Sequence, residues 1–95
     1  MFDIYYSKCV IDKLEQIKLN RLLERMLNDF ETTLEINPFS IKYPEKEIPE
    51  NVKIPAAVIA KYHYVELSSN LRILYHICES DSSVEIYAID IKKEK

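Results

Sequence analysis

The chain has 95 residues, of which 47% are hydrophobic and 31% are charged, and this balance predicts one globular domain, residues 1–95, with a single core. Its formal net charge of −3 argues against sequence-independent nucleic-acid binding, because that affinity comes from neutralising phosphates with lysine and arginine. The absence of glycine excludes the P-loop and the dinucleotide-binding fingerprint, which need glycine for a phosphate to approach the backbone.

The N-terminal half predicts one strand followed by two helices. Residues 2–6 are a short apolar and aromatic run, which is typical of a strand, and Ser7 is placed to cap the helix that follows. Apolar residues then recur at three- and four-residue intervals, the pattern of an amphipathic helix, but the phase breaks after Ile17. We therefore predict helices at about 8–17 and about 19–35, folded as a hairpin or joined by a kink, with one continuous bent helix as the alternative.

The middle of the chain predicts a long surface connection. Asn37 suits the C-terminal end of a helix, and Pro38 cannot continue it. Residues 38–55 carry all four prolines among charged residues, which is typical of an extended loop. Loops of this length often contain a short strand of their own, and residues 52–54 are the candidates for such pairing.

The C-terminal half predicts three strands. Runs rich in β-branched and aromatic residues fall at about 57–67, 71–78 and 84–91. Both connections are short enough for antiparallel hairpins, and Asn70 is the residue best suited to a positive φ in the first of them. The order predicts an α+β fold of two layers: an N-terminal strand, a two-helix hairpin and a three-stranded antiparallel meander.

Strict alternation assigns the residues of the last two strands to faces. On the middle strand of the meander, the face expected under the helices holds Leu71, Ile73, Tyr75 and Ile77, and the other face holds Arg72, Leu74, His76 and Cys78. On the last strand, one face holds Val84, Ile86 and Ala88, and the other holds Glu85, Tyr87, Ile89 and Ile91. Arg72 thus lies in the middle of an apolar strand, where its charge requires solvent, a partner or a bound anion.

Three segments carry a resemblance to a known family. Ile4-Tyr5-Tyr6-Ser7, with Leu14 downstream, resembles the family's first strand and the start of its first helix, and Asn37-Pro38-Phe39 resembles the turn after its second helix. The strand Leu71-Arg72-Ile73-Leu74-Tyr75-His76-Ile77, followed by residues 84–89, is similar to the family's arginine-bearing strand and the one after it. The family is the RelE/ParE superfamily of toxins from bacterial and archaeal toxin–antitoxin pairs. The resemblance spans nearly the whole chain and implies the two-layer RelE-like sandwich.

The resemblance also implies a function: the toxin of a type II toxin–antitoxin system, a ribosome-dependent mRNA endoribonuclease (mRNA interferase) that works without metal. In such members the arginine of this strand lies at the scissile phosphate, and Arg72 is the matching position. Attack by a 2′-hydroxyl builds negative charge on the phosphate, which a forked guanidinium stabilises. Lys61 and His63 lie on the preceding strand where the family carries basic residues, and they are the candidates for proton transfer, His63 being the better titrating group.

Four further residues are candidates for substrate binding. His76 shares the predicted face of Arg72, and Tyr75 has an aromatic ring of the kind that stacks on bases in RNA-binding sheets. Lys92 and Lys93 follow the last strand, where the family also carries basic residues.

Each candidate has a structural interpretation as well. Arg72 is also explained by an ion pair across the sheet with Glu66 or Glu85, and the tyrosines by packing in the core. The histidines are then hydrogen-bonded or solvated strand residues.

Three functional hypotheses therefore stay open. The first is the endoribonuclease, with the ribosome and mRNA as partners; the retained Arg72, Leu74 and Tyr75 favour it. The second is a ParE-like toxin that binds DNA gyrase through its helical hairpin. The third is a catalytically degenerate member of the fold that acts by protein–protein binding, favoured by the acidic net charge. In the toxin hypotheses a cognate antitoxin covers the helices or the sheet face.

The remaining features predict no metal and no small-molecule cofactor. Cys9 and Cys78 are far apart and lack the spacing of a metal site, so we expect both to be reduced and mostly buried. His63 and His76 complete no zinc motif. The first residues show no basic leader before a long apolar run, so we expect neither a secretory signal nor a membrane span, and a cytoplasmic location.

Overall fold

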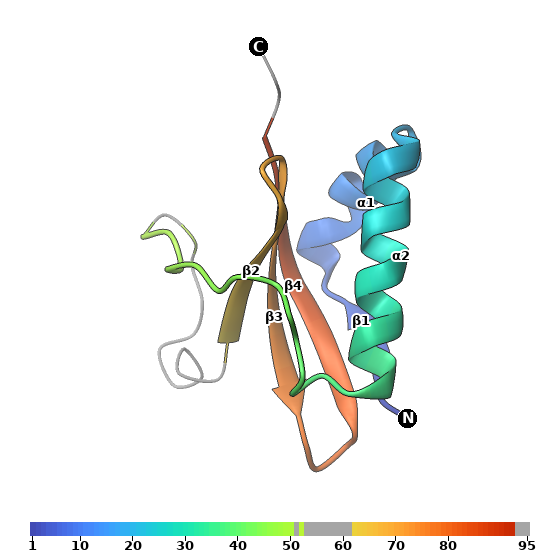
Figure 1. Ribbon diagram of the computed structural model, residues 1–95, viewed down its shortest axis with the longest axis vertical. Coiled ribbons are helices and arrows are strands. Elements are labelled where there is room, and N and C mark those ends of the chain that lie inside the picture. Colours follow the sequence, from blue (N-terminus) through green and yellow to red (C-terminus); the bar gives the residue numbers. More distant parts are fainter. Residues whose placement is uncertain (51, 53–61, 93–95) are drawn as a thin grey trace.

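The computed structural model describes residues 1–50, 52 and 62–92, and in these residues helices and strands form two layers (Figure 1). In chain order the elements are β1 (Asp3–Tyr6), a 3₁₀ helix η1 (Lys8–Val10), α1 (Ile11–Lys18), α2 (Arg21–Ile36), β2 (Tyr62–Ser68), β3 (Leu71–Cys78) and β4 (Ser83–Ile91). The α1–α2 hairpin covers one face of the sheet. The predicted α+β class and order of elements are confirmed.

The four strands form one mixed sheet in the order β1-β4-β3-β2. β2, β3 and β4 are antiparallel neighbours, as predicted for the meander. β1 pairs with β4 in parallel, with Ile4 opposite Val84, which closes the N-terminal segment onto the last strand. β3 is therefore flanked on both sides, and a side chain on it meets neighbours from β2 and β4.

The break between α1 and α2 has a local cause in Asn20. Its side chain accepts hydrogen bonds from the backbone N–H groups of Leu22 and Leu23, at 3.1 and 3.2 Å, and so caps the start of α2. The two helices then fold as a hairpin, which confirms that interpretation and makes the continuous bent helix wrong.

The core lies between the helices and the sheet. Its buried residues come from both layers: Val10, Ile17, Leu23, Leu27, Phe30, Leu34, Val65, Leu71, Ile73, Tyr75, Val84, Ile86 and Ile89. The Phe30 ring meets the Tyr75 ring edge to face at a centroid distance of 5.5 Å, and it meets Tyr43 in the same way and at the same distance. Phe30 is 0% exposed, so its ring is a fully buried contact between the middle of α2 and β3.

β4 does not alternate strictly, because its pairing with β3 contains a β-bulge. Successive pairs jump from Ala88 to Ile86, which leaves Tyr87 as an extra residue. Beyond the bulge the side chains change faces, so Ile89 and Ile91 pack with the core on the same side as Ile86. The faces predicted for Ala88, Ile89 and Ile91 are therefore wrong.

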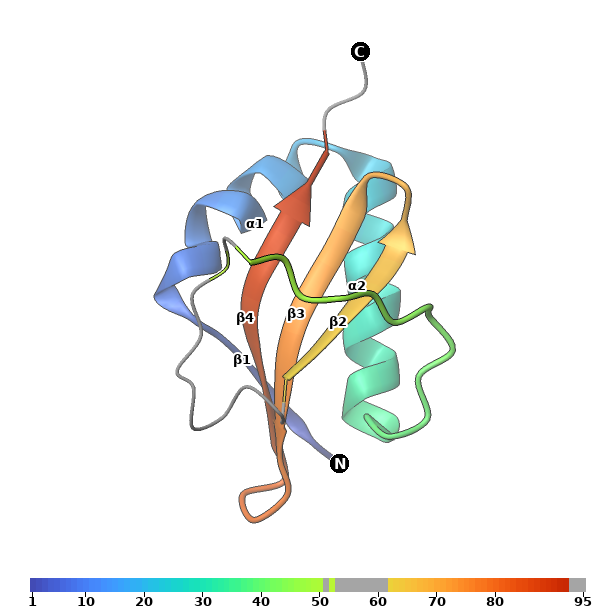
Figure 2. The ribbon, with the colours of Figure 1, turned by 90° about the vertical axis from the view of Figure 1, so that its left-hand side faces the viewer.

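The long connection after α2 pairs with the sheet, but earlier than predicted. Glu45 bridges to Val65, the Lys46 N–H donates to the carbonyl of Tyr64 at 2.7 Å, and the Glu66 N–H donates to the carbonyl of Pro44 at 2.9 Å. This pairing covers the outer edge of β2, which would otherwise present free backbone groups. In Figure 2 the segment that follows crosses the face of the sheet turned away from the helices. Of the predicted residues 52–54, Val52 bonds to Pro49 and the other two lie outside the described residues.

Two local predictions fail for identifiable reasons, and a third is confirmed. The Ser7 hydroxyl donates to the carbonyl of Tyr87 at 2.7 Å, so it ties η1 to β4 and does not cap the helix. The one positive φ among described residues is at Ser82 (φ 50°), so Asn70 does not have the predicted conformation. The prediction for Asn37 is confirmed: Asn37 follows the last residue of α2 as its C-terminal cap, and its N–H donates to the carbonyl of Thr33 at 2.9 Å. Its side chain accepts from the Phe39 N–H at 3.1 Å.

None of the helices in the described residues is long and apolar enough to cross a membrane.

Candidate functional site

Arg72 lies on the face of the sheet that is turned away from α1 and α2, which we call the far face. It is opposite Glu66 on β2 and Asp90 on β4. Its Nη2 is 3.5 Å from Oε1 of Glu66, and the other oxygen of that carboxylate, Oε2, is 3.5 Å from Nζ of Lys46. The Glu66 carboxylate thus lies between two cations. The structure therefore contains the cross-strand ion pair between Arg72 and Glu66 that the structural interpretation of Arg72 predicts.

Tyr64 completes this group on the far face. Its hydroxyl donates to Oδ2 of Asp90 at 2.8 Å, and Cζ of Arg72 lies 5.9 Å from the centroid of its ring. Burial, followed by the hydrogen bond and charge of Asp90, raises the pKa of Tyr64 to about 12 against the opposing effect of Arg72. The phenol therefore stays protonated at neutral pH and acts as a donor.

We call Lys46, Tyr64, Glu66, Arg72 and Asp90 the Arg72 cluster. It contains two cations and two carboxylates, so its formal charge is balanced. The side chain of Arg72 is 25% exposed and that of Glu66 is 22% exposed. Nε of Arg72 is buried and has no hydrogen-bond partner among the described residues. The guanidinium is therefore neutralised by its neighbours but not fully satisfied as a donor.

His63 lies on the opposite face of the sheet from Arg72. In the β2–β3 register His63 is opposite Tyr75, whereas Glu66 is opposite Arg72, and alternation turns these two pairs to different faces. The imidazole stacks on the Tyr75 ring at 5.3 Å, and its Nδ1 is 2.8 Å from Oε1 of Glu45. The prediction that His63 is a catalytic partner of Arg72 therefore does not fit the structure.

His76 shares the far face with Arg72 but lies further along β3, within a row of aromatic rings. It stacks on Tyr62 at a centroid distance of 5.2 Å, and Tyr62 meets Tyr87 edge to face at 5.4 Å. The substrate-binding prediction for Tyr75 does not fit its position, because that ring is 2% exposed and packs in the core. Burial also raises the pKa of Tyr75 to about 12.

A cavity of about 440 Å³ lies where β2 begins and β3 ends. It is lined by Phe39, His63, His76, Ile77, Cys78, Glu79 and Ser80. Sγ of Cys78 is 3.4 Å from Oγ of Ser80 and 3.5 Å from Oδ2 of Asp81. The cavity contains two residues predicted from sequence, His63 and His76, but Arg72 is not among its lining residues.

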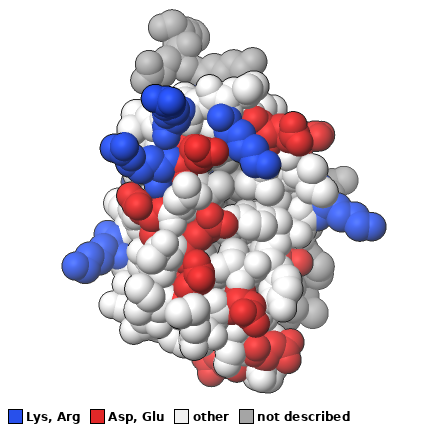
Figure 3. Space-filling view, turned by 90° about the vertical axis from the view of Figure 1, so that its right-hand side faces the viewer, with Lys and Arg blue, Asp and Glu red and all other residues white. Residues whose placement is uncertain are grey.

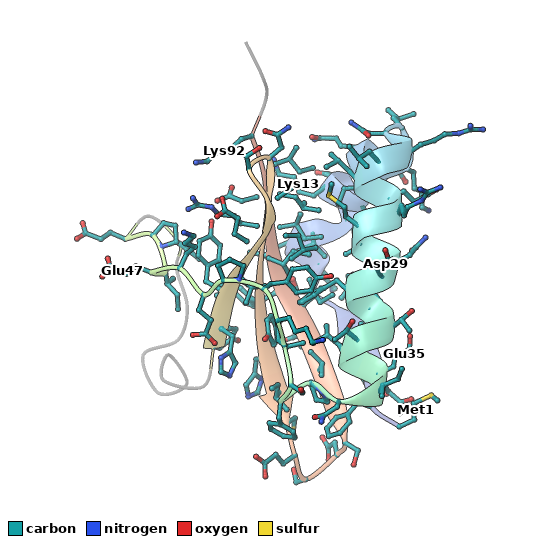
Figure 4. All side chains as sticks on the ribbon, viewed as in Figure 1. Met1, Lys13, Asp29, Glu35, Glu47 and Lys92 are labelled. Atoms are coloured by element: carbon teal, nitrogen blue, oxygen red, sulfur yellow. The ribbon has the colours of Figure 1, made fainter. Side chains whose placement is uncertain are left out.

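A second surface lies on the helices. α2 carries four acidic residues, Glu24, Asp29, Glu31 and Glu35, and begins with two arginines, Arg21 and Arg25. In Figure 3 acidic side chains run down the middle of this side of the molecule, and basic ones gather towards the top. Figure 4 places Asp29 and Glu35 on α2 and Glu47 on the other side of the sheet.

A groove of about 280 Å³ separates α1 from α2. Its apolar lining comes from Tyr6, Leu14, Ile17 and Leu27, and its polar lining from Lys18, Glu24, Asn28 and Glu31. Burial, and then the charge of Glu35, raises the pKa of Glu31. The helical side thus combines an apolar groove with carboxylates, a combination suited to a partner segment that carries both apolar and basic side chains.

Comparison with known proteins gives matches in structure only. No protein-family model and no curated protein matches the chain by sequence. The YoeB/ParE toxin from Agrobacterium tumefaciens superposes with a TM-score of 0.71 at 14% identity, over 97% of this chain and 100% of that one. A metal-bound toxin from Helicobacter pylori gives 0.69 at 17% identity, over 96% and 94%. The toxin–antitoxin complex RelBE2 from Mycobacterium tuberculosis gives 0.64 at 14% identity, over 96% and 98%. The chain has the RelE/ParE toxin fold.

The remaining predicted site residues are Lys92, which the structure describes, and Lys61 and Lys93, which it does not. Lys92 is exposed, its N–H donates to the carbonyl of Asn70 at 2.9 Å, and it lies at the end of β4 beside the β2–β3 turn (Figure 4). Lys61 and Lys93 lie outside the described residues. Cys9 and Cys78 are both free, but Cys9 is exposed and Cys78 is half-buried, so the expected burial of the cysteines is wrong.

The sequence predicts Arg72 and its partner Glu66, but it does not predict the other three members of the Arg72 cluster. Tyr64 and Glu66 share a face by alternation, so the position of Tyr64 follows from the same pattern. Asp90 comes opposite Arg72 only because of the β4 bulge, which strict alternation does not predict. Lys46 lies in the proline-rich connection, where no periodicity indicates which residue meets the sheet.

Proposed function

We propose that the chain is the toxin-fold component of a type II toxin–antitoxin pair and that a cognate antitoxin binds it. The observation that supports this most is the match in fold over 96–97% of the chain to three toxins, one of them in a toxin–antitoxin complex. The groove between α1 and α2, with its acidic residues, offers a surface for such a partner. A cytoplasmic location, expected from sequence, belongs to the same proposal.

Of the three activities considered, action by protein–protein binding is the one that the geometry of the far face supports best. Arg72 is engaged by Glu66, and the charges around it balance, so a scissile phosphate meets no excess of positive charge there. His63, the candidate base, is on the other face. A ribonuclease needs both a free cation and a base at the same phosphate.

The ribosome-dependent, metal-free endoribonuclease is the second candidate, and one observation favours it. Arg72 lies on the far face, away from the helices, with Lys46 and the protonated hydroxyl of Tyr64 nearby. In this hypothesis Arg72 stabilises the phosphate charge created by 2′-hydroxyl attack on mRNA. Glu66 then has to move away before the phosphate binds.

A growth experiment tests the proposal and separates these activities. The chain is expressed in bacteria alone and together with the product of the small reading frame beside its gene. We expect expression alone to slow growth, Arg72→Ala to slow it equally, and the second product to restore growth and copurify. Arg25→Ala, an exposed arginine on α2, is the matched control.

Each other outcome has a definite meaning. The endoribonuclease is supported if Arg72→Ala restores growth and Arg25→Ala does not, and if mRNA is cleaved in cells that express the wild type but not in cells that express Arg72→Ala. Loss of DNA supercoiling by gyrase in the presence of the purified protein supports the ParE-like hypothesis. Normal growth with soluble, full-length protein, and no complex with the neighbouring product, contradicts the toxin proposal.

A further inference from the structure

Most of the large apolar side chains that are exposed in the described residues lie at the two ends of the long axis of the molecule. Leu19 and Leu22, at the turn between α1 and α2, are 90% and 60% exposed. Ile36 and Phe39, where α2 ends, are 71% and 58% exposed, and Met1 is 92% exposed. The α1–α2 turn is at the top of Figure 1, and the end of α2 and the N-terminus are at the bottom. Apolar side chains that are grouped in water gain free energy when a partner covers them.

The exposed leucines of the α1–α2 turn are accompanied by positive charge. We call residues 18–22 the upper end; it contains two cations, Lys18 and Arg21, and no acidic residue. Neither cation forms an ion pair with another described residue. Glu24 and Arg25, which follow on α2, cancel each other in formal charge. Figure 3 shows basic side chains towards the top of the helical side and acidic ones at its bottom.

Three segments meet at the opposite end of the molecule. The Phe2 N–H donates to the carbonyl of Glu35 at 2.9 Å, and the Phe2 ring meets the Phe39 ring edge to face at a centroid distance of 5.9 Å. The Asp3 N–H donates to the carbonyl of Ser82 at 3.0 Å, so the β3–β4 turn lies beside the N-terminal segment. We call the exposed apolar and acidic residues of these segments the lower end: Met1, Asp3, Glu35, Ile36, Phe39, Glu79 and Asp81.

The lower end is negatively charged and also carries a cavity. Its four carboxylates are opposed by the α-amino group of Met1, and none of them forms an ion pair within the part of the chain that the structure describes. The nearest lysine in sequence is Lys42, three residues after Phe39. Phe39 and Glu79 line the cavity of about 440 Å³, together with Ile77. The lower end therefore offers an apolar recess with an acidic border.

The two ends are complementary in both shape and charge. We propose that the upper end of one copy of this chain docks on the lower end of another, with Leu19 in the cavity beside Phe39 and with Lys18 and Arg21 facing the carboxylates. The two surfaces lie at opposite ends of the long axis, so the contact is heterologous and does not close. Successive copies then form an open head-to-tail chain.

A second copy is the occupant that suits both ends at once. A nucleic acid or an anionic lipid surface attracts the cations of the upper end, but the carboxylates of the lower end repel both. A basic peptide suits the lower end and leaves Leu19 and Leu22 exposed. Because a few side chains form the contact, it belongs with small, weak interfaces, and we expect a Kd of about 0.1–1 mM at low salt.

The inference goes beyond the proposed toxin role, because it concerns contacts between copies of the purified chain in the absence of an antitoxin. A failure to associate leaves the toxin–antitoxin proposal untouched. A failure of the growth experiment likewise leaves the association measurement valid.

Sedimentation equilibrium of the full chain over a range of concentrations tests the association. The average mass of the wild type is expected to rise with concentration and to pass the mass of a dimer. Raising the salt concentration from about 0.01 M to about 0.1 M shortens the Debye length from about 30 Å to about 10 Å and is expected to raise the Kd about three- to tenfold.

One variant blocks the upper end. Leu19→Glu with Arg21→Glu replaces an exposed leucine and reverses a charge, and it is expected to stay monomeric at every concentration. The matched control is Ile11→Glu with Lys8→Glu, which makes the same change in charge at the junction of η1 and α1, midway along the molecule (Figure 2). Ile11 is 53% exposed, and this control is expected to keep the wild-type Kd within about twofold.

A second variant blocks the lower end. Ile36→Lys with Glu79→Lys is expected to be monomeric as well. Its matched control is Ile11→Lys with Glu47→Lys, which adds the same charge away from both ends and is expected to associate as the wild type does. Circular dichroism checks that each variant is folded. Leu19→Ser and Ile36→Ser replace the double variants if either of these folds poorly.

Mixing the two blocked variants gives the most specific result. The upper-end variant keeps an intact lower end, and the lower-end variant keeps an intact upper end, so one productive contact remains between them. The mixture is expected to form a 1:1 dimer and nothing larger, with a Kd within about threefold of the wild-type value. A symmetric dimer, in which the same surface meets itself, does not behave in this way.

Four results overturn the inference. The first is a wild type that stays monomeric or stops at a dimer. The second is a blocked variant that associates by itself as the wild type does, and the third is a mixture of the two variants that forms no dimer. The fourth is a monomeric wild type that sediments with phosphatidylglycerol vesicles through Leu19 and Arg21, which assigns the upper end to a lipid surface.

Discussion

The two faces of the sheet are built on different physical principles. The face under α1 and α2 is a continuous apolar layer in which Phe30 and Tyr75 make edge-to-face contact. The far face carries the Arg72 cluster and an aromatic row, with Tyr64 and Leu74 buried between polar neighbours. Burial of apolar area stabilises a fold, whereas exposed or half-exposed ion pairs contribute little. The comparison therefore assigns stability to the helix-covered face and leaves the far face available for recognition.

The largest expected effect lies in the helix-covered layer. Phe30→Ala removes a ring that is 0% exposed and contacts both Tyr43 and Tyr75, so it is expected to lower the free energy of unfolding by about 3–5 kcal/mol. Urea denaturation followed by circular dichroism measures the change. Leu22→Ala on the same helix is the control, because Leu22 is 60% exposed and is expected to cost about 0.5 kcal/mol or less. Similar losses in the two variants would contradict the assignment of the core.

A second variant tests the bulge in β4, beyond which the side chains of this strand lie on the opposite side of the sheet from the one that strict alternation predicts. Ile89 packs in the core because of the bulge at Tyr87, so Ile89→Ala is expected to cost about 2–5 kcal/mol. Ala88→Ser, on the far face, is expected to cost about 1 kcal/mol or less. Strict alternation requires the opposite ranking. Thermal unfolding of the two variants side by side therefore decides between the bulged and the regular strand.

The regular and the irregular parts of the fold differ in how far the sequence predicts them. The period of three and four residues along α2 and the period of two along β3 come from the geometry of helix and strand. The helix hairpin, the meander and the core side of β3 can therefore be predicted from the sequence. The bulge at Tyr87 and the turn conformation at Ser82 depend on how neighbouring segments fit, and no local pattern encodes them.

The candidate site was predicted less completely than the fold for a related reason. Arg72 is conspicuous in sequence as a charge within an apolar strand, and Glu66 was one of two carboxylates offered as its partner. Lys46 reaches the cluster from a connection without periodicity, so its contact exists only in three dimensions. The resemblance makes His63 a partner of Arg72, because the family carries basic residues on the preceding strand, but the register of β2 against β3 turns His63 and Arg72 to opposite faces.

A pH experiment examines the far face through Tyr64. Its environment raises the pKa of Tyr64 to about 12 from a usual value of 10.0. The unfolded chain then loses its phenolic proton first, so this contribution to stability is complete below about pH 10 and falls as pH rises towards 12. Urea unfolding at about pH 9 and about pH 11 is expected to show lower stability at the higher pH.

Tyr64→Phe isolates that contribution. The buried Tyr75 has its pKa raised to about 12 as well and produces a loss in the same direction, so the variant is expected to reduce the alkaline loss without removing it. At neutral pH the variant loses one hydrogen bond, to Asp90, and is expected to cost about 1 kcal/mol. An alkaline loss of unchanged size in Tyr64→Phe would contradict the role assigned to this phenol.

The smallest expected effect is the coupling between Arg72 and Glu66, and it bears most directly on the difference between the faces. Their contact is 3.5 Å long and both side chains are partly exposed, so solvent screening reduces the interaction. A double-mutant cycle with Arg72→Met and Glu66→Gln is expected to give a coupling free energy of about 1 kcal/mol or less. The matched control is Arg25→Met with Glu66→Gln, whose members lie on different layers and are expected to be additive. A coupling of about 3 kcal/mol, as found when a buried pair is broken, would make the cluster part of the structural core. A small coupling instead means that Glu66 can leave Arg72 at little cost in stability, which is the condition that the endoribonuclease candidate requires.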